Sequence, residues 1–139
     1  MWAPFEKRLA AARIALLTSA GFYVKASQPS FDLPREQANP EWGDPAWRSI
    51  PAGADAGELA VAHLHINEDD VLADPEIALP MRTLDALVSD GIAGGATSHH
   101  IAVMGYQERR LRDWQSKTGP EIAAHLRSEG ADGVVLAPA

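Results

Sequence analysis

A length of 139 residues, with 46% hydrophobic and 22% charged residues, is typical of one globular domain that can bury its own core. The net charge of −7 argues against a nucleic-acid partner, because proteins that bind a phosphate backbone usually display a basic surface. The absence of cysteine excludes a disulfide framework, and no apolar run is long enough to span a bilayer. Residues 1–8 lack the layout of a signal peptide, so we expect a soluble, cytoplasmic protein.

The N-terminal third contains one clear apolar run and one long irregular segment. Residues 13–18 predict a buried strand, although residues 10–17 also fit a helix that continues from Phe5 and Leu9. The segment at about 28–57 is rich in Pro, Asp, Gly and Trp and has no apolar period. A loop of this length in a small domain is usually a lid or a binding segment. An irregular segment whose tryptophans simply cover the core fits equally well.

Further along the chain, strand and helix patterns alternate. Residues 59–66 predict a second strand, and apolar residues at helical spacing over 81–88 predict a helix that ends near Asp90 and Gly91. Residues 101–104 form another short apolar run after a glycine break at 94–95. The pattern up to this point favours strands that are buried on both faces.

The C-terminal third predicts two helices and a last strand. Tyr106, Leu111 and Trp114 indicate a helix that ends near Lys117, and residues 118–121 match a capping box that begins the next helix. Residues 133–137 have the pattern of a buried strand. Strands that alternate with helices indicate an α/β, Rossmann-like layered domain with a mainly parallel sheet, and we expect one domain over residues 1–139.

Two histidine pairs lie where an apolar run gives way to polar residues, which is where α/β domains usually place chemistry. His63 and His65 would share one face of the predicted strand, and His99 and His100 follow a glycine-rich segment. Neutral imidazole binds metal ions, so His63, His65 and His99 form an alternative transition-metal site. Acid–base chemistry is the other role open to them, because histidine titrates near neutrality.

Other polar residues either complete this candidate site or stay outside it. Thr18 and Ser19 end the first strand and could offer hydroxyl groups and free amides to an anion. His125 lies inside the predicted capped helix, and we expect it to be a surface or packing residue.

Several motifs occur in an order that resembles a known family over nearly the whole chain. They are residues 18–23 (TSAGFY), 43–51 (GDPAWRSIP), 63–67 (HLHIN), 79–84 (LPMRTL), 91–92 (GI), 98–105 (SHHIAVMG) and 130–138 (GADGVVLAP). This ordered set is similar to the glycine/sarcosine/betaine reductase selenoprotein B family, in the branch that contains the selenoprotein subunit of D-proline reductase. His100 departs from the pattern, because the family tends to carry an aromatic residue there.

The resemblance implies an oxidoreductase subunit that takes part in reductive cleavage of a C–N bond. In the family a selenocysteine or cysteine attacks, and it follows shortly after the strand that matches residues 134–136; D-proline reductase also uses a pyruvoyl group on a different subunit. This chain has no thiol, so its cofactors would belong to a partner or to a segment beyond Ala139. We expect a second chain that completes the family fold in a hetero-oligomer.

From these observations we expect a histidine-lined cleft for a small amino acid or related amine. His65, His99 and His100 would be catalytic, with His65 or His99 as the proton donor. The residues expected to bind substrate are Thr18, Ser19, His63 and Asn67. The alternatives are a homologue that uses its histidines in place of the thiol, a non-catalytic subunit that binds a partner through residues 28–57, and a histidine-metal hydrolase or lyase.

Overall fold

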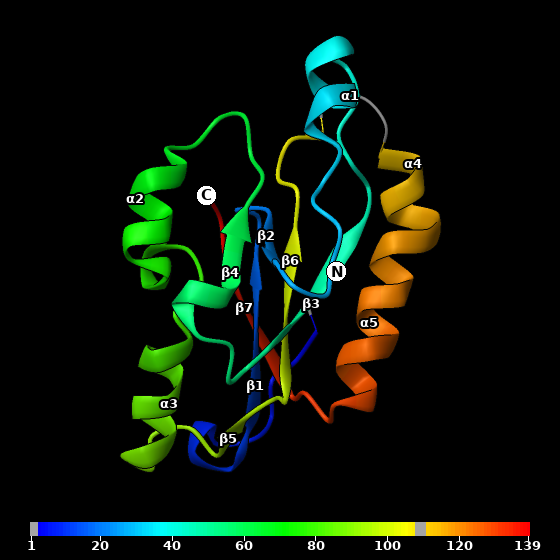
Figure 1. Cartoon of the computed structure of the whole chain (residues 1–139). Coiled ribbons are helices and arrows are strands. Elements are labelled where there is room, and N and C mark those ends of the chain that lie inside the picture. Colours follow the sequence, from blue (N-terminus) through cyan, green and yellow to red (C-terminus); the bar gives the residue numbers. More distant parts are fainter. Residues whose placement is uncertain (1–2, 108–110) are drawn as a thin grey trace.

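The computed structural model describes residues 3–107 and 111–139. Its main sheet contains β1 (Arg13–Thr18), β3 (Trp47–Pro51), β5 (Gly95–Ala96), β6 (His99–Val103) and β7 (Gly133–Ala137). β6 and β7 pair with β1 in parallel, and β3 pairs with β6 antiparallel. β5 pairs in parallel with the first residues of β1. The order β3-β6-β1-β7 places β1 at the centre (Figure 1).

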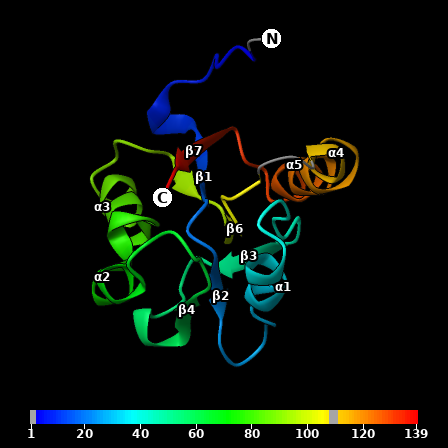
Figure 2. The same ribbon diagram turned by 90° about the horizontal axis from the view of Figure 1, so that it is seen from above.

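Helices cover both faces of this sheet, as the view from above shows (Figure 2). One face carries α2 (Glu68–Ala73) and α3 (Met81–Ser89). The other carries a continuous helical segment made of α4 (Leu111–Asp113), a π-helical turn (Trp114–Thr118) and α5 (Gly119–Ser128). The coarse expectation of an α/β domain with a mainly parallel sheet is confirmed.

Alternation along β1 divides the core between these two faces. Ile14 and Leu16 belong to the apolar cluster that includes residues of α3, whereas Ala15 belongs to the cluster with Ile122 and Leu126 of α5. Successive side chains of a strand point to opposite faces, so this single strand packs against both helical layers. The apolar run at residues 13–18 is therefore a strand, and the alternative of a helix through residues 10–17 is wrong.

A two-stranded ribbon of β2 (Phe22–Val24) and β4 (Leu59–Val61) extends from the carboxyl end of β1. Gly21 makes this connection with a φ of +71°, and a Cβ there would lie 2.3 Å from the carbonyl oxygen of Ala62. A glycine is therefore required at position 21 for two reasons: the positive φ, and the close approach of the backbone at Ala62.

The strand predicted over residues 59–66 is shorter in the structure, which ends it at Val61. Its partner β2 is only three residues long, so residues beyond Val61 have no strand to pair with. The chain turns instead, and the Asn67 side chain caps α2 by accepting a hydrogen bond from the backbone N–H of Asp69. His63 and His65 consequently lie in the loop between β4 and α2 and not on the face of a strand.

The segment at about 28–57 contains more regular structure than its composition indicates. It holds α1 (Leu33–Ala38), which begins at an Asp32 cap, and β3 at the edge of the main sheet. Arg48 of β3 donates hydrogen bonds to the carbonyl oxygens of Pro29 and Ser30, which attaches the preceding loop to this edge. Short 3₁₀ turns occur at Leu9–Ala11, Ala56–Glu58 and Pro75–Ile77.

The capping box predicted at residues 118–121 is absent. Thr118 has helical backbone angles, and its hydroxyl donates to the carbonyl oxygen of Pro45 at 2.6 Å. Pro120 has no N–H to donate into the preceding turn, and a π-helical turn lets the helix continue past it. Of the helix predicted from Tyr106 to Lys117, residues 108–110 lie outside the described residues.

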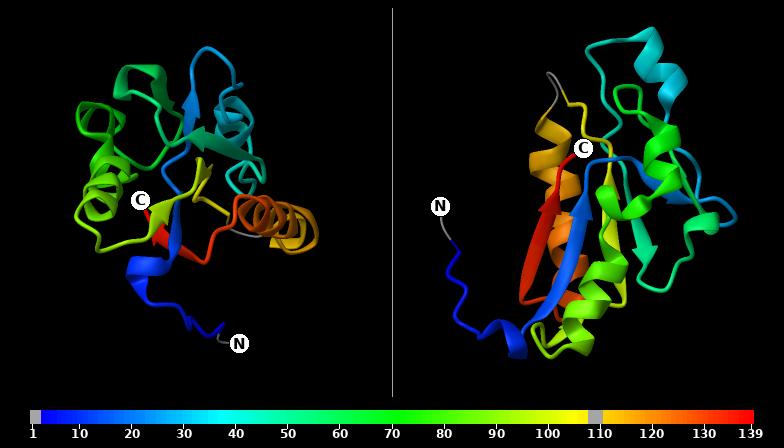
Figure 3. Two further views of the ribbon diagram at one scale, coloured as in Figure 1. Left: turned by 90° about the horizontal axis from the view of Figure 1, so that it is seen from below. Right: turned by 90° about the vertical axis from the view of Figure 1, so that its left-hand side faces the viewer.

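β7 has the predicted bounds but not the predicted burial. Its side chains of Val134, Val135 and Leu136 are 41%, 49% and 67% exposed, because the strand lies at the edge of the sheet beside β1 (Figure 3). An exposed run of large apolar residues along an edge strand is unusual on the surface of a monomeric globular domain. Within the described residues, no helix is long and apolar enough to cross a membrane.

Candidate functional site

Four polar or aromatic side chains gather beside the carboxyl end of the parallel strands: Glu36, His63, His65 and Tyr106, here called the edge cluster. The His65 ring lies 5.9 Å from the His63 ring and 4.8 Å from the Tyr106 ring, measured between centroids. The Nε2 atom of His65 lies 3.8 Å from Oε1 of Glu36. These side chains come from two loops and from α1, so only the tertiary structure brings them together.

Backbone hydrogen bonds hold these loops at the end of β1. The N–H of Gly105 donates to the carbonyl oxygen of Ser19, and the N–H of Gly21 donates to that of Val103. The N–H of Ala62 in turn donates to the carbonyl oxygen of Gly21. The segment at residues 19–21, directly after β1, therefore lies between residues 103–105 on one side and Ala62, the residue before His63, on the other.

Glu36 is the most unusual member of the edge cluster. The residue is 2% exposed, and neither carboxylate oxygen accepts a hydrogen bond from a described residue. Burial raises the pKa of Glu36, the nearby His65 opposes this shift, and Asp44 reinforces it. A buried carboxyl group with a raised pKa beside a histidine is a common feature of functional sites.

His63 is also buried, and its ring is only partly satisfied. Its Nδ1 accepts a hydrogen bond of 3.1 Å from the backbone N–H of His65, which places the ring in the turn. Its Nε2 is buried without a hydrogen-bond partner among the described residues. Burial, followed by the proximity of His65, lowers the pKa of His63. His65 itself is 54% exposed at its side chain, so it is the histidine of this cluster that can meet a substrate.

The structure gives the other residues predicted to bind substrate mainly local roles. Thr18 is fully buried, and its hydroxyl accepts a hydrogen bond from the N–H of Ala20. The hydroxyl of Ser19 accepts a hydrogen bond of 2.9 Å from the N–H of Ala139. Asn67 caps α2 and donates to Asp70 at 2.7 Å. Thr18 is the last residue of β1 and Ser19 follows it, so both residues lie at the carboxyl end of β1, near the edge cluster.

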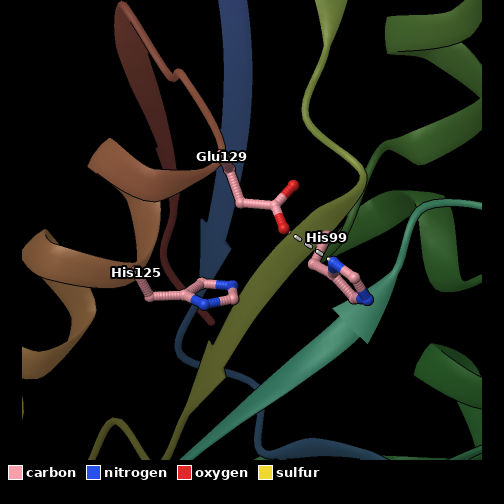
Figure 4. Close-up of side chains that lie close together, drawn as sticks. All are labelled: His99, His125 and Glu129. Carbon is pink, nitrogen blue, oxygen red and sulfur yellow. Dashed lines mark hydrogen bonds and ion pairs between the residues drawn. The ribbon is translucent and has the colours of Figure 1, made fainter.

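A second group, His99, His125 and Glu129, lies on the face of the sheet that α5 covers and is here called the face cluster (Figure 4). Nδ1 of His99 lies 3.0 Å from Oε1 of Glu129. The ring centroids of His99 and His125 are 6.0 Å apart. Hydrogen bonds from His99 and from Ser98 lower the pKa of Glu129, so its carboxylate is held ionised.

His99 and His100 are neighbours in sequence but lie on opposite faces of β6. His100 is 1% exposed, and its Nδ1 accepts a hydrogen bond of 3.2 Å from the N–H of Leu16. Burial lowers the pKa of His100 to about 4, so the ring is neutral at pH 7. The structure thus places His100 in the core, and His99 beside α5, away from His63 and His65.

In the part of the chain that the structure describes, the histidines of the two pairs are therefore divided between the edge cluster, the face cluster and the buried position of His100. Among the described residues, the three-residue group that could hold a metal ion is His99, His125 and Glu129, not His63, His65 and His99. A hollow of about 430 Å³ lies between residues 44–47 and the helical segment at 113–121, and no member of the edge cluster lines it. The members missing from the sequence prediction are Glu36, Tyr106, His125 and Glu129. The four-residue spacing of His125 and Glu129 was a usable signal, whereas nothing local distinguished Glu36.

Comparison with known proteins yields one informative similarity. No family model matches the chain, and no solved structure matches it. The chain is 31% identical over 136 residues to D-proline reductase subunit gamma of Acetoanaerobium sticklandii, an alignment that covers 98% of this chain. The chain spans about half the length of that relative, 52%. The similarity supports a relation between this chain and the subunits of that reductase.

Proposed function

We propose that this chain is a component of a reductase-type assembly that cleaves a C–N bond of a small amino acid or related amine. The observation that carries the proposal is the similarity to D-proline reductase subunit gamma, which extends over 98% of the chain. D-Proline is accordingly the first substrate to test. The edge cluster would form this chain's part of the substrate site.

The position of the edge cluster supports this role. Three of the parallel strands occur in the spatial order β6-β1-β7, so that β1, the first of them in the sequence, lies between the other two. This order, with helices on both faces, is the reason to propose a Rossmann-like architecture. In such sheets ligands bind outside the carboxyl ends of the strands where the order reverses. That point is the end of β1, beside Ser19, Gly105 and the edge cluster.

The reactive thiol or selenol would come from a partner chain or from a segment beyond Ala139, and a pyruvoyl group from another subunit. The thiol or selenol would attack the carbon that bears the nitrogen, and a second thiol would then release that carbon by forming a disulfide or selenosulfide with the first. The two reducing electrons would thus come from this pair, which an external dithiol would regenerate. The carboxyl end of β7 reaches the same edge, because Ala137 pairs with Thr18 and the Ala139 N–H donates to Ser19. Within the described residues, the Glu36 carboxylate and Nε2 of His63 are buried without a hydrogen-bond partner, so a substrate or a partner chain could satisfy them.

In this assembly His65 would be the proton donor. When the C–N bond breaks, its electron pair stays on nitrogen, and the amine needs a proton to leave. The His65 ring is exposed enough to reach a substrate, and Tyr106 packs against it. Glu36 would act as a positioning residue, because its carboxylate lies 3.8 Å from Nε2 of His65 and can orient the ring.

The exposed edge of β7 would be the surface that the partner covers. Val134, Val135 and Leu136 present a continuous apolar strand whose outer backbone edge is unpaired within the described sheet. Addition of a strand from another chain would satisfy this edge and bury the apolar side chains. This surface also favours the second candidate function, a non-catalytic subunit whose role is to bind a partner.

The test is isolation of the tagged full chain from its native host without oxygen, with co-purifying chains identified by mass spectrometry. We expect a stoichiometric partner that bears cysteine or selenocysteine, and a complex that reduces D-proline or another small amino acid with a dithiol as electron donor. A chain that purifies as a folded monomer of 14.9 kDa would contradict the assembly. A stoichiometric complex in which His65→Gln leaves turnover unchanged would favour the non-catalytic subunit.

A further inference from the structure

We infer that the face cluster is a binding site for a zinc-class divalent cation, with His99, His125 and Glu129 as ligands. One ligand atom from each residue lies within 4.8 Å of the ligand atoms of the other two. Figure 4 shows His99 on β6, with His125 and Glu129 at the end of α5, converging from two sides on one space. This site is separate from the edge cluster and independent of the proposed reductase role.

The distances are close to those that a metal ion requires. Zinc bonds of about 2.0–2.2 Å in tetrahedral geometry place ligand atoms roughly 3.3 Å apart. Nδ1 of His99 and Oε1 of Glu129 are already 3.0 Å apart, so this pair could hold an ion after His99 loses its Nδ1 proton. The ligand atom of His125 lies within 4.8 Å of those of the other two residues, and its side chain is on the last turn of a helix and partly exposed, so it has room to approach.

The local backbone explains why these three residues meet. His125 and Glu129 are four residues apart, and the N–H of Glu129 donates to the carbonyl oxygen of His125, so both side chains lie on the same side of α5. β6 runs beneath this side of α5, because Ile101 of β6 packs in the same cluster as Ile122 and Leu126. His99 is two residues before Ile101 and points to the same face.

Neighbouring groups already orient the three ligands. The second carboxylate oxygen of Glu129 accepts a hydrogen bond of 2.8 Å from the N–H of Ser98, which leaves the first oxygen for His99 or a metal. The His125 ring lies 5.2 Å from the Trp47 ring, and the Ser49 hydroxyl lies 3.4 Å from its Nε2. Metal ligands are commonly held in this way by groups that contact them, and such groups raise metal affinity.

The donor set indicates the class of ion. Two imidazoles and one carboxylate form a set typical of zinc and related transition ions, whereas Mg²⁺ and Ca²⁺ prefer oxygen ligands alone. Three protein ligands leave a fourth position for water or another small ligand. The His99 side chain is 39% exposed, so that position is accessible from solvent.

The experiment is titration of the chelator-treated full chain with Zn²⁺ by calorimetry, and with Co²⁺ by absorption spectroscopy. We expect one ion per chain and a Co²⁺ spectrum with the intense visible bands of four-coordinate sites. His99→Gln and His125→Gln should each weaken Zn²⁺ binding by at least tenfold, and Glu129→Gln should do the same. His65→Gln, which removes an exposed histidine of the edge cluster, should leave the affinity unchanged.

Circular dichroism and thermal unfolding without metal serve as the folding control. Only variants with the circular dichroism spectrum of the wild type are compared for Zn²⁺ binding. Zn²⁺ should raise the Tm of the wild-type chain and of His65→Gln, but not that of folded His125→Gln. Binding at substoichiometric levels, or equal affinity in the wild type and His125→Gln, would overturn the proposal. Loss of binding in His65→Gln alone would move the site to the edge cluster and overturn it equally.

Discussion

The edge cluster and the face cluster use the same two residue types in opposite ways. In the edge cluster, Glu36 is buried, accepts no hydrogen bond from a described residue and has a raised pKa. In the face cluster, Glu129 accepts hydrogen bonds from His99 and Ser98 and has a lowered pKa. Burial destabilises the ionised form of Glu36, whereas hydrogen bonds stabilise the ionised form of Glu129. Unsatisfied polar groups often mark sites that act on a substrate, and satisfied ones suit binding and support.

The strongest test of this contrast compares His65→Ala with His99→Ala in the isolated assembly. Loss of a general acid typically lowers turnover by about 10²–10⁴-fold, and we expect a loss in this range for His65→Ala. His99→Ala should change kcat by less than about tenfold, because its ring does not reach the edge cluster. Steady-state kinetics with urea unfolding as a stability control would measure both. An equal loss for the two variants would contradict the assignment of catalysis to one cluster.

The next largest effect concerns the stability of the chain in acid. His100 has a folded-state pKa of about 4 and an ordinary value of 6.5, so the unfolded chain binds the proton first as the pH falls. Stability should therefore be intact above pH 6.5 and decline as the pH falls to about 4, by roughly 3 kcal/mol from this residue. His63 adds to the same trend because its pKa is also lowered.

Urea unfolding at pH 7 and at pH 4.5 measures this decline. His100→Gln can still offer an acceptor to the Leu16 N–H but cannot titrate, so its stability should depend less on pH. A variant whose stability declines as steeply as that of the wild type would show that another group causes the acid sensitivity.

A matched pair of substitutions sharpens the contrast between the carboxylates. The folded-state pKa of Glu36 is raised, so the wild-type chain loses stability as the pH rises above 4.5, and Glu36→Gln should avoid this loss. We expect Glu36→Gln to be more stable than the wild type at pH 8 by about 1 kcal/mol. The pKa of Glu129 is lowered, so its contribution is present above pH 4.5 and lost at lower pH.

Glu129→Gln should therefore destabilise the chain at pH 8, by less than about 1 kcal/mol because the hydrogen bonds of this carboxylate are near the surface. Denaturant unfolding of both variants at pH 4 and pH 8 gives the two signs directly. Destabilisation by Glu36→Gln at pH 8 would contradict the view that Glu36 is the destabilised carboxylate.

The smallest effect on the isolated chain is expected on β7. Leu136 is 67% exposed, so Leu136→Asp should change the free energy of unfolding by about 0.5 kcal/mol or less. The same substitution should prevent recovery of the partner chain if that partner covers this edge. Ile77→Asp, at an apolar residue that is 62% exposed on the 3₁₀ turn Pro75–Ile77, serves as the matched charge control away from the strand. Retention of the partner by Leu136→Asp would move the interface elsewhere.

Local patterns predicted the elements that depend on neighbouring residues. The apolar runs at β1 and β7 and the helical spacing of α3 were sufficient, because these elements bury apolar residues at regular intervals. The prediction over residues 59–66 was too long, because the length of β4 depends on its partner β2. The capping box at residues 118–121 was wrong, because Thr118 bonds to the distant Pro45 and not to its own helix.

By itself, the sequence determined an α/β chain without thiols, with histidines at the ends of apolar runs and a similarity to reductase subunits. Only the tertiary structure decided which histidines act together. It placed Glu36 from α1 beside His65, and it placed His125 and Glu129 from α5 beside His99. The physical reason is that a site is made by side chains from separate elements, and their distances, burial and hydrogen bonds depend on how those elements pack. His99 and His100 show this most directly, since adjacent residues of one strand point to opposite faces.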